Sequence, residues 1–89
     1  MREAYLEVTY RHGQPLAAYL YLPRESRVKS VRTRRVEPGM IVDLDARGQA
    51  LGIEITAPPQ LTLVALNRLL RELGCAPVRR IDLAPLRAA

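Results

Sequence analysis

Alternation of apolar and polar residues, interrupted by turn sequences, is the feature that most constrains how this chain folds. Every second residue is apolar over residues 3–10 and again over 16–22, which is the period of a half-buried β-strand. His12-Gly13-Gln14-Pro15 between them is a turn sequence, and Pro23 ends the second segment. We therefore predict a β-hairpin from these residues.

A second hairpin is predicted from residues 40–45 and 50–56, around Asp45-Ala46-Arg47-Gly48. Its register has two solutions. The Asp-x-x-Gly turn pairs Asp45 with Gln49 and sets Asp43 opposite Leu51. A register shifted by one residue keeps one face wholly apolar, and we favour it. Its pairs are Leu44 with Leu51, Val42 with Ile53 and Met40 with Ile55.

Residues 60–73 have the apolar spacing of an amphipathic helix. Pro58-Pro59 precedes this segment, and Gly74 stands where a glycine often ends a helix. The apolar arc is wider than one sheet contact needs, so we expect the helix to pack on its own sheet and also on a second chain. The candidate interface leucines are Leu63, Leu66, Leu69, Leu70 and Leu73.

The chain of 89 residues has the length of one domain. We expect an α+β fold in which a small antiparallel sheet of four or five strands is followed by one C-terminal amphipathic helix and a short tail. The sheet takes residues 1–56, the helix 57–74 and the tail 75–89, where 78–83 can form a short strand that Pro85 ends. A chain this short has a thin core, which self-association would supplement.

Positive charge is concentrated just before the second hairpin. The net charge is +5, and the segment 26–36 is predicted as an edge strand with a bulge. Its arginines and lysine either discourage edge-to-edge aggregation or contact phosphates of a nucleic acid or an acidic partner. The candidate contact residues are Arg27, Lys29, Arg32, Arg34 and Arg35.

Three tyrosines are expected on one face of the sheet. Tyr5, Tyr19 and Tyr21 share the parity of their strands, so their rings can gather there. Such a face either packs against a helix or a second chain or, with neighbouring arginines, stacks on the bases of a single strand. We count Tyr19 and Tyr21 with the leucines as candidate interface residues.

Residues 36–55 read V-E-P-G-M-I-V-D-L-D-A-R-G-Q-A-L-G-I-E-I. This segment resembles the signature of a small prokaryotic family, domain-of-unknown-function family 2283, and the likeness extends more weakly back to Ala4. The resemblance implies a small antiparallel β domain in the cytoplasm without known catalysis, and some members look like partners of small toxin-like proteins. A glycine within a strand, here Gly52, permits close approach by a bulky ring, and we expect Tyr19 or Tyr21 to lie over it.

Residues that could support catalysis are few. Asp43, Asp45 and Glu54 can share the outward face of the second hairpin, where three carboxylates could bind Mg²⁺ or Ca²⁺. His12 has no partner for a triad or a zinc site, and the single cysteine, Cys75, has no partner for a disulfide. We therefore predict that the chain is not an enzyme and holds no metal or cofactor.

The leading hypothesis is a non-enzymatic, self-associating protein-binding module, antitoxin-like or regulatory, that forms a homodimer. The alternative is a nucleic-acid-binding protein that uses the basic residues of segment 24–35. A third is a metal-dependent enzyme that uses the three carboxylates. No apolar run approaches the ~20 residues that a membrane span needs, and no secretory signal is visible, so we expect a cytoplasmic protein.

Overall fold

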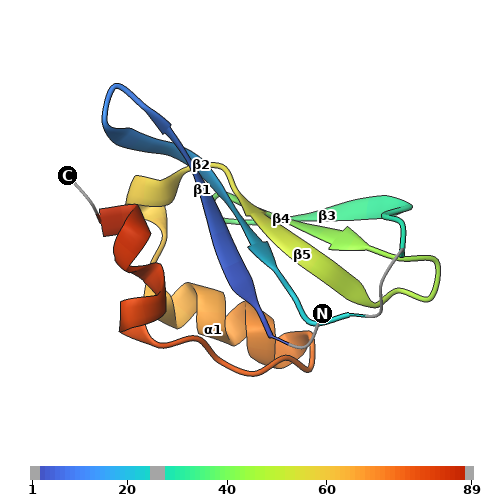
Figure 1. Ribbon diagram of the computed structural model, residues 1–89. Coiled ribbons are helices and arrows are strands. Elements are labelled where there is room, and N and C mark those ends of the chain that lie inside the picture. The colour runs from blue at the N-terminus through green and yellow to red at the C-terminus, as the bar shows by residue number, and fades with distance from the viewer. Residues whose placement is uncertain (1–2, 25–27, 88–89) are drawn as a thin grey trace.

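Five antiparallel strands form one sheet in the order β1-β2-β5-β4-β3 (Figure 1). The computed structural model describes residues 3–24 and 28–87. The strands are β1 Tyr5–Arg11, β2 Gln14–Tyr21, β3 Arg32–Val36, β4 Met40–Leu44 and β5 Ala50–Ile55. The helical elements are η1 Pro58–Gln60, α1 Leu63–Glu72 and η2 Arg80–Arg87. The predicted α+β fold, with a small antiparallel sheet and an amphipathic helix, is confirmed.

The β4–β5 hairpin contains both of the registers considered above. Met40 pairs with Ile55 and Val42 with Ile53, as the apolar pattern predicts, but a register shift lies between Asp43 and Leu44. Beyond the shift Leu44 pairs with Ala50, and the Asp45 N–H donates to the Gln49 carbonyl at 2.9 Å. The predicted pair of Leu44 with Leu51 is therefore wrong.

Leu51 is the extra residue of a β-bulge on β5, and this bulge makes the two registers compatible. The turn keeps the geometry that Gly48 allows at φ 82°, while the apolar face stays intact further along the strands. The Leu51 carbonyl accepts a hydrogen bond from the Leu22 N–H at 3.1 Å. The bulge thus also ties the end of β2 to β5.

The basic segment forms an edge strand, as predicted. Only residues from Arg32 onward are in β3, which pairs with β4 in one continuous register from Arg32 opposite Leu44 to Val36 opposite Met40. The expected bulge is absent from this paired part of the strand. Its edge position and its charged side chains discourage pairing with another sheet.

Helix α1 is shorter than the predicted 60–73 because residues Pro58–Gln60 form a separate 3-10 turn. Thr62 caps α1, and its hydroxyl accepts a hydrogen bond from the Ala65 N–H at 3.1 Å. At the other end Gly74 takes φ 75°, the Gly74 N–H donates to Arg71 and the Cys75 N–H donates to Leu70. This pair of bonds is a Schellman motif, so the predicted helix end at Gly74 is confirmed.

The tail folds onto the core as a 3-10 helix and not as the short strand considered for 78–83. Pro85, expected to end that strand, lies inside η2. Asn67 of α1 holds the connection, since its side chain donates to the Val78 carbonyl and accepts from the Val78 N–H. The Tyr10 hydroxyl donates to the Pro85 carbonyl at 2.8 Å.

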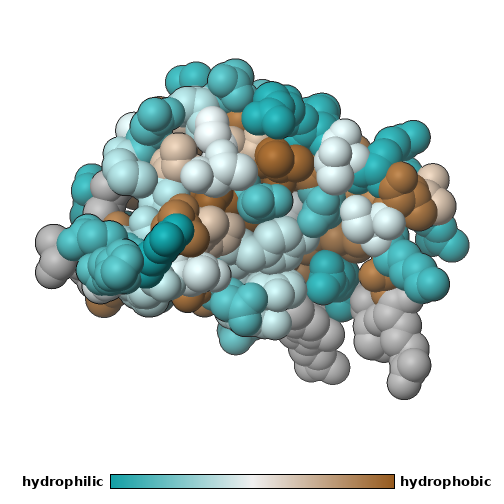
Figure 2. Space-filling model, turned by 90° about the horizontal axis from the view of Figure 1, so that it is seen from above, coloured by the Kyte–Doolittle hydropathy of each residue, from teal (hydrophilic) through white to brown (hydrophobic). Residues whose placement is uncertain are grey.

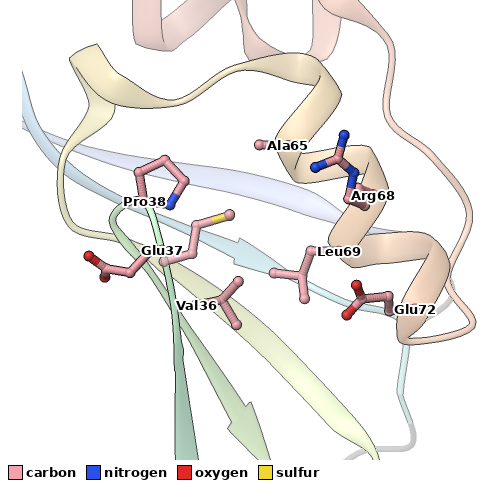
Figure 3. Close-up of a pocket in the computed structure, with 8 residues that line it drawn as sticks. Val36, Glu37, Pro38, Ala65, Arg68, Leu69 and Glu72 are labelled. Atoms are coloured by element: carbon pink, nitrogen blue, oxygen red, sulfur yellow. The ribbon is translucent and has the colours of Figure 1, made fainter.

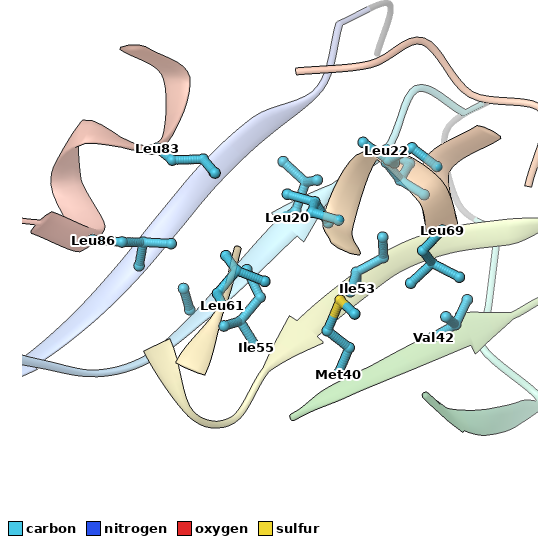
Figure 4. Packing of buried hydrophobic residues seen from close by; sticks show 13 residues of the cluster. Leu20, Leu22, Met40, Val42, Ile53, Ile55, Leu61, Leu69, Leu83 and Leu86 are labelled. Atoms are coloured by element: carbon cyan, nitrogen blue, oxygen red, sulfur yellow. The ribbon is translucent and has the colours of Figure 1, made fainter. Parts of the chain in front are cut away.

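The core lies between the sheet and a single covering layer made of α1 and η2 (Figures 1 and 4). Alternate residues of β2, β4 and β5 point into it, and Leu66, Leu70 and Leu83 meet them from the helical layer. The buried cluster consists of Ala18, Leu20, Leu22, Met40, Val42, Ile53, Ile55, Leu61, Leu66, Leu69, Leu70, Leu83 and Leu86. Among the residues that the structure describes, helical elements cover only this face of the sheet.

Candidate functional site

The face of the sheet opposite α1 and η2, here called the open face, is not covered by any helix or strand of residues 3–24 and 28–87 (Figure 2). Side chains of alternate strand residues point to it, because their neighbours point into the core. Figure 2 shows pale and brown side chains interspersed with teal ones on this side. Its central residues are Tyr5, Glu7, Thr9, Ala17, Tyr19, Tyr21, Thr33, Arg35, Ile41, Asp43, Gly52 and Glu54.

Tyr19 lies across the middle of the open face, over Gly52. A Cβ atom at Gly52 would overlap the tyrosine ring, so only glycine fits this strand position. The Tyr19 hydroxyl reaches β4 and donates to Asp43 Oδ2 at 2.6 Å. The expectation that a tyrosine ring covers Gly52 is confirmed, and Tyr19 is the residue that does so.

Burial, and secondarily the hydrogen bond to the Asp43 carboxylate, raises the pKa of Tyr19 well above its ordinary value. Both causes favour the neutral phenol over the phenolate. Tyr19 is therefore held as a proton donor to Asp43 and is not available as a base.

Tyr21 forms an aromatic cluster with Tyr5 and Tyr19 on the open face. Its ring stacks on Tyr5 with centroids 4.5 Å apart and meets Tyr19 edge-on at 4.6 Å. The Tyr21 hydroxyl donates to Glu7 Oε1 at 3.1 Å, and this bond raises the pKa of Tyr21. The Arg24 guanidinium lies 5.7 Å from the centre of the Tyr21 ring and donates to the Leu51 carbonyl at 3.0 Å. The rings are thus fixed by contacts with each other and with charged groups.

A shallow hollow of about 190 Å³ lies beside this cluster. Ala17 lies at its base, where the small side chain leaves space between β1 and β5. Two exposed carboxylates, Glu7 and Glu54, line it from the strands on either side of β2. The hollow suits a cationic group better than an anionic one, because both charged side chains that line it are acidic.

The predicted basic residues do not form one surface. Arg32 and Arg34 alternate with Arg35 along β3, so the first two point to the helical side of the sheet and Arg35 points to the open face. Arg34 confirms this placement, because it pairs with Glu72 of α1 at 3.8 Å. Arg27 lies outside the described residues.

Arg32 and Lys29 belong to one end of the sheet. The Arg32 guanidinium lies against Gly48 of the β4–β5 turn, where Arg47 is also exposed. The Val31 N–H donates to the Leu44 carbonyl at 2.8 Å and brings the segment that contains Lys29 to the same end. These side chains therefore form a small basic end, made of Lys29, Arg32 and Arg47.

The three carboxylates considered for a metal site are not brought together. Asp43 and Glu54 lie on the open face, but Asp45 is buried in the hairpin turn, where its Oδ1 accepts the N–H groups of Arg47 and Gln49, each at 2.8 Å. Among residues 3–24 and 28–87, no group of three or more His, Cys, Asp or Glu side chains could hold a metal ion. The hypothesis of a metal-dependent enzyme loses its ligand set.

The candidate interface leucines are used within the chain. Leu66, Leu69 and Leu70 are buried against the sheet, and Leu63 and Leu73 pack at the edge of the same core. Val64 is an apolar residue of α1 that remains largely exposed, at 68%. The wide apolar arc is thus explained by the sheet on one side and by the tail on the other, and Tyr19 and Tyr21 are the interface candidates left on an open surface.

A second hollow, of about 120 Å³, lies between α1 and the β3–β4 turn (Figure 3). Val36, Leu69 and Met40 line its apolar part, and Arg68 and Glu72 lie at the helix side. It is small and follows from the way α1 rests on the sheet edge. Cys75 offers no chemistry nearby, since burial raises the pKa of its thiol and disfavours the reactive thiolate.

Sequence reasoning placed the tyrosines on one face but missed the hollow beside them. The signal was present in the alternation, since Glu7, Thr9 and Ala17 share the parity of Tyr5 and Tyr19. What was missing was the pairing of β2 with β5, which places Glu54 on the far side of Ala17. In the described ranges, no helix is both long enough and apolar enough to cross a membrane.

Comparison with known proteins finds a family model that matches part of the chain. Residues 17–57 match the model of a family described as Protein of unknown function (DUF2283), which confirms the resemblance over those residues. The match runs from within β2 to the residue before η1, so β1, α1 and η2 lie outside it. No curated protein and no solved structure matches the chain.

Proposed function

We propose that this chain, which carries the DUF2283 family segment over residues 17–57, is a non-catalytic binding module that self-associates through the open face of its sheet. The observation that carries the proposal is the fixed aromatic cluster of Tyr5, Tyr19 and Tyr21 on a face with no covering layer. Tyrosine and arginine are enriched where proteins bind one another. The homodimer is the simplest assembly, because closed two-fold symmetry is the commonest arrangement of like chains.

The cluster is better suited to a protein surface than to nucleic acid bases. Tyr5 and Tyr21 already stack on each other, so a base would have to separate them. Glu7, Asp43 and Glu54 lie on the same face and would repel a phosphate backbone. We therefore assign the open face to protein contact, as in a regulatory or antitoxin-like protein. The proposed function is binding and not catalysis.

Sedimentation velocity across about 1 to 100 µM protein tests this proposal. We expect a concentration-dependent monomer–dimer equilibrium. Ile41→Glu places a charge in the centre of the open face, where Ile41 is half-buried between Arg35 and Glu54, and should shift the equilibrium to monomer.

Val64→Glu is the matched control, since it puts the same charge on the exposed side of α1 and should leave the equilibrium unchanged. Circular dichroism checks that both variants fold. A single monomeric species throughout the range, or association that Ile41→Glu does not weaken, contradicts the proposal.

A second candidate function is the binding of a nucleic acid or another polyanion at the basic end. The contact of Arg32 with the β4–β5 turn, where Arg47 lies, favours this function. The contact brings together positive charges that come from different elements of the chain. Retention on heparin at increasing salt tests it. Arg32→Gln with Arg47→Gln should flatten the salt dependence by about one unit of slope for each phosphate that the variant no longer binds.

Arg71→Gln with Arg80→Gln removes the same charge from exposed positions elsewhere and serves as the control. Equal retention of the two double variants would show that only net charge matters and would remove this second candidate.

A further inference from the structure

We propose that the self-associated form is a face-to-face pair in which Arg35 of each copy pairs with Glu7 of the other. This inference rests on the proposed function and specifies how the two open faces meet. It commits to a second copy of this chain as the occupant, because the charges on the open face complement each other under a two-fold rotation.

The strand pairings place the charged residues in one row across the sheet. Glu7 pairs with Tyr19, Tyr19 with Glu54, Glu54 with Ile41, and Ile41 with Arg35. All five side chains point to the open face. The row therefore begins with an acidic residue on the edge strand β1 and ends with a basic residue on the opposite edge strand β3.

A two-fold axis that runs along β5, in the plane between the two sheets, reverses the order of the strands and keeps each residue in its row. It sets β3 of one copy over β1 of the other, so Arg35 faces Glu7 and Ile41 faces Tyr19. An axis across the strands through this row would set each strand over itself and oppose Arg35 to Arg35, Glu54 to Glu54 and Glu7 to Glu7. The first axis opposes like charges in this row only at Glu54. Like charges in contact are unfavourable, so the charge pattern favours the first axis.

The hollow beside Glu7 adds negative charge where Arg35 arrives. It measures about 190 Å³, and Ala17 leaves its base low while Tyr19 leans the other way, over Gly52. Glu7 lines it from β1 and Glu54 from β5, so the Arg35 that faces Glu7 lies at its acidic rim. The planar fork of an arginine is well matched to carboxylates.

The charged groups can make this contact. Within the described part of the chain, the Arg35 side chain is exposed and forms no hydrogen bond or ion pair. Glu7 is exposed and gives only Oε1 to the Tyr21 hydroxyl, so its other carboxylate oxygen remains for Arg35. The two Glu54 residues meet near the axis, the one place in this row where the arrangement opposes like charges. The aromatic rings of Tyr19 meet Ile41 beside these charges, so the row combines apolar and ionic contact.

Charge exchange tests the proposed register. Arg35→Glu alone should weaken dimerisation by about tenfold to a hundredfold, measured as the dimer dissociation constant by sedimentation velocity. Glu7→Arg alone should weaken it similarly, because it faces the unchanged Arg35 of the other copy. The double variant Arg35→Glu with Glu7→Arg restores opposite charges and should recover most of the affinity.

Arg71→Glu is the control, since it makes the same change of net charge as Arg35→Glu on the exposed side of α1 and should leave the dissociation constant within about twofold. A wild type that dimerises, with no recovery in the double variant, overturns the inference and leaves the proposed function standing. A wild type that stays monomeric overturns both. A salt-sensitive dimer that the double variant restores supports both.

Discussion

At the scale of single residues, Tyr19 links three strands by one side chain. It starts from β2, lies over Gly52 of β5 and ends on Asp43 of β4. Because the hydrogen bond is partly buried, losing it leaves the Asp43 carboxylate with one partner fewer in a less polar surrounding. We expect Tyr19→Phe to lower the free energy of unfolding by about 1 kcal/mol, measured by urea denaturation.

Burial of the Tyr19 hydroxyl, together with the same bond, makes stability depend on alkaline pH. The pKa of Tyr19 is raised in the folded state above the ordinary tyrosine value of 10.0, so the unfolded chain loses this proton first. The contribution of this raised pKa to the free energy of unfolding is fully present below pH 10.0, and it is lost as the pH rises toward the folded-state pKa. Between about pH 8 and about pH 11 the wild type should therefore lose more stability than Tyr19→Phe does; equal losses would show that Tyr19 is not the group responsible.

Gly52 is the other half of this contact. Gly52→Ala forces the Tyr19 ring away from β5 and breaks its bond to Asp43, which should cost about 1 to 3 kcal/mol. In a Tyr19→Ala background the same substitution has no ring to displace. A double-mutant cycle measures the difference, and a cost for Gly52→Ala that is the same in both backgrounds would contradict this account.

At the scale of elements, η2 acts as part of the core and not as a loose tail. Leu83 is 2% exposed and packs with the sheet residues, whereas Ile81 of the same helix is 69% exposed. Leu83→Ala should lower the free energy of unfolding by about 2 to 3 kcal/mol, because it removes buried methyl groups and leaves a cavity. Ile81→Ala is the matched control and should change it by less than about 0.5 kcal/mol; a cost of Leu83→Ala that is equally small would contradict the role of η2 in the core.

The elements that the sequence predicts well are those with a strong period. The alternating segments appear as β1, β2, β4 and β5, and the leucine spacing appears as α1 ending at Gly74. The β4–β5 bulge was not predictable, because the turn and the apolar pattern each indicated one register and only an extra residue at Leu51 satisfies both. The tail was missed since its two buried leucines, Leu83 and Leu86, give too short a pattern to distinguish a strand from a 3-10 helix.

The candidate site was predictable only in part, for a related reason. The alternation within each strand correctly predicted that the tyrosines share one face and that a tyrosine ring covers Gly52. The alternation of strand residues does not continue through a turn. For this reason Asp45, expected beside Asp43 on the open face, instead binds the backbone of its own turn. The pairing of β2 with β5, which creates the hollow, joins segments far apart in the chain and leaves no local signal.

At the scale of the whole molecule, the two sheet edges and the open face are competing places for association. Strand β3 presents Arg32, Arg34 and Arg35, and an antiparallel pair of such strands would bring like charges together. Face-to-face association avoids that cost. It also leaves the backbone groups on the outer edges of β1 and β3 unpaired.

Hydrogen exchange distinguishes these arrangements. In the face-to-face pair, the outward amides of β1 and β3 should exchange quickly in dilute and in concentrated solution alike, while the hydrogen-bonded centre of the sheet stays protected. Exchange followed by nuclear magnetic resonance at two protein concentrations provides the measurement. Protection of β3 that grows with concentration would indicate edge pairing and argue against the open face as the interface.

The junction between β2 and β5 also has a kinetic consequence. The hairpins β1–β2 and β4–β5 each close a turn of a few residues, whereas β2 meets β5 only after the whole of β3 and β4 has been looped back. Closing that long loop costs chain entropy before any contact repays it. We therefore expect the step that joins the two hairpins to limit the folding rate, and substitutions at their junction, where Tyr21 pairs with Gly52, to slow folding.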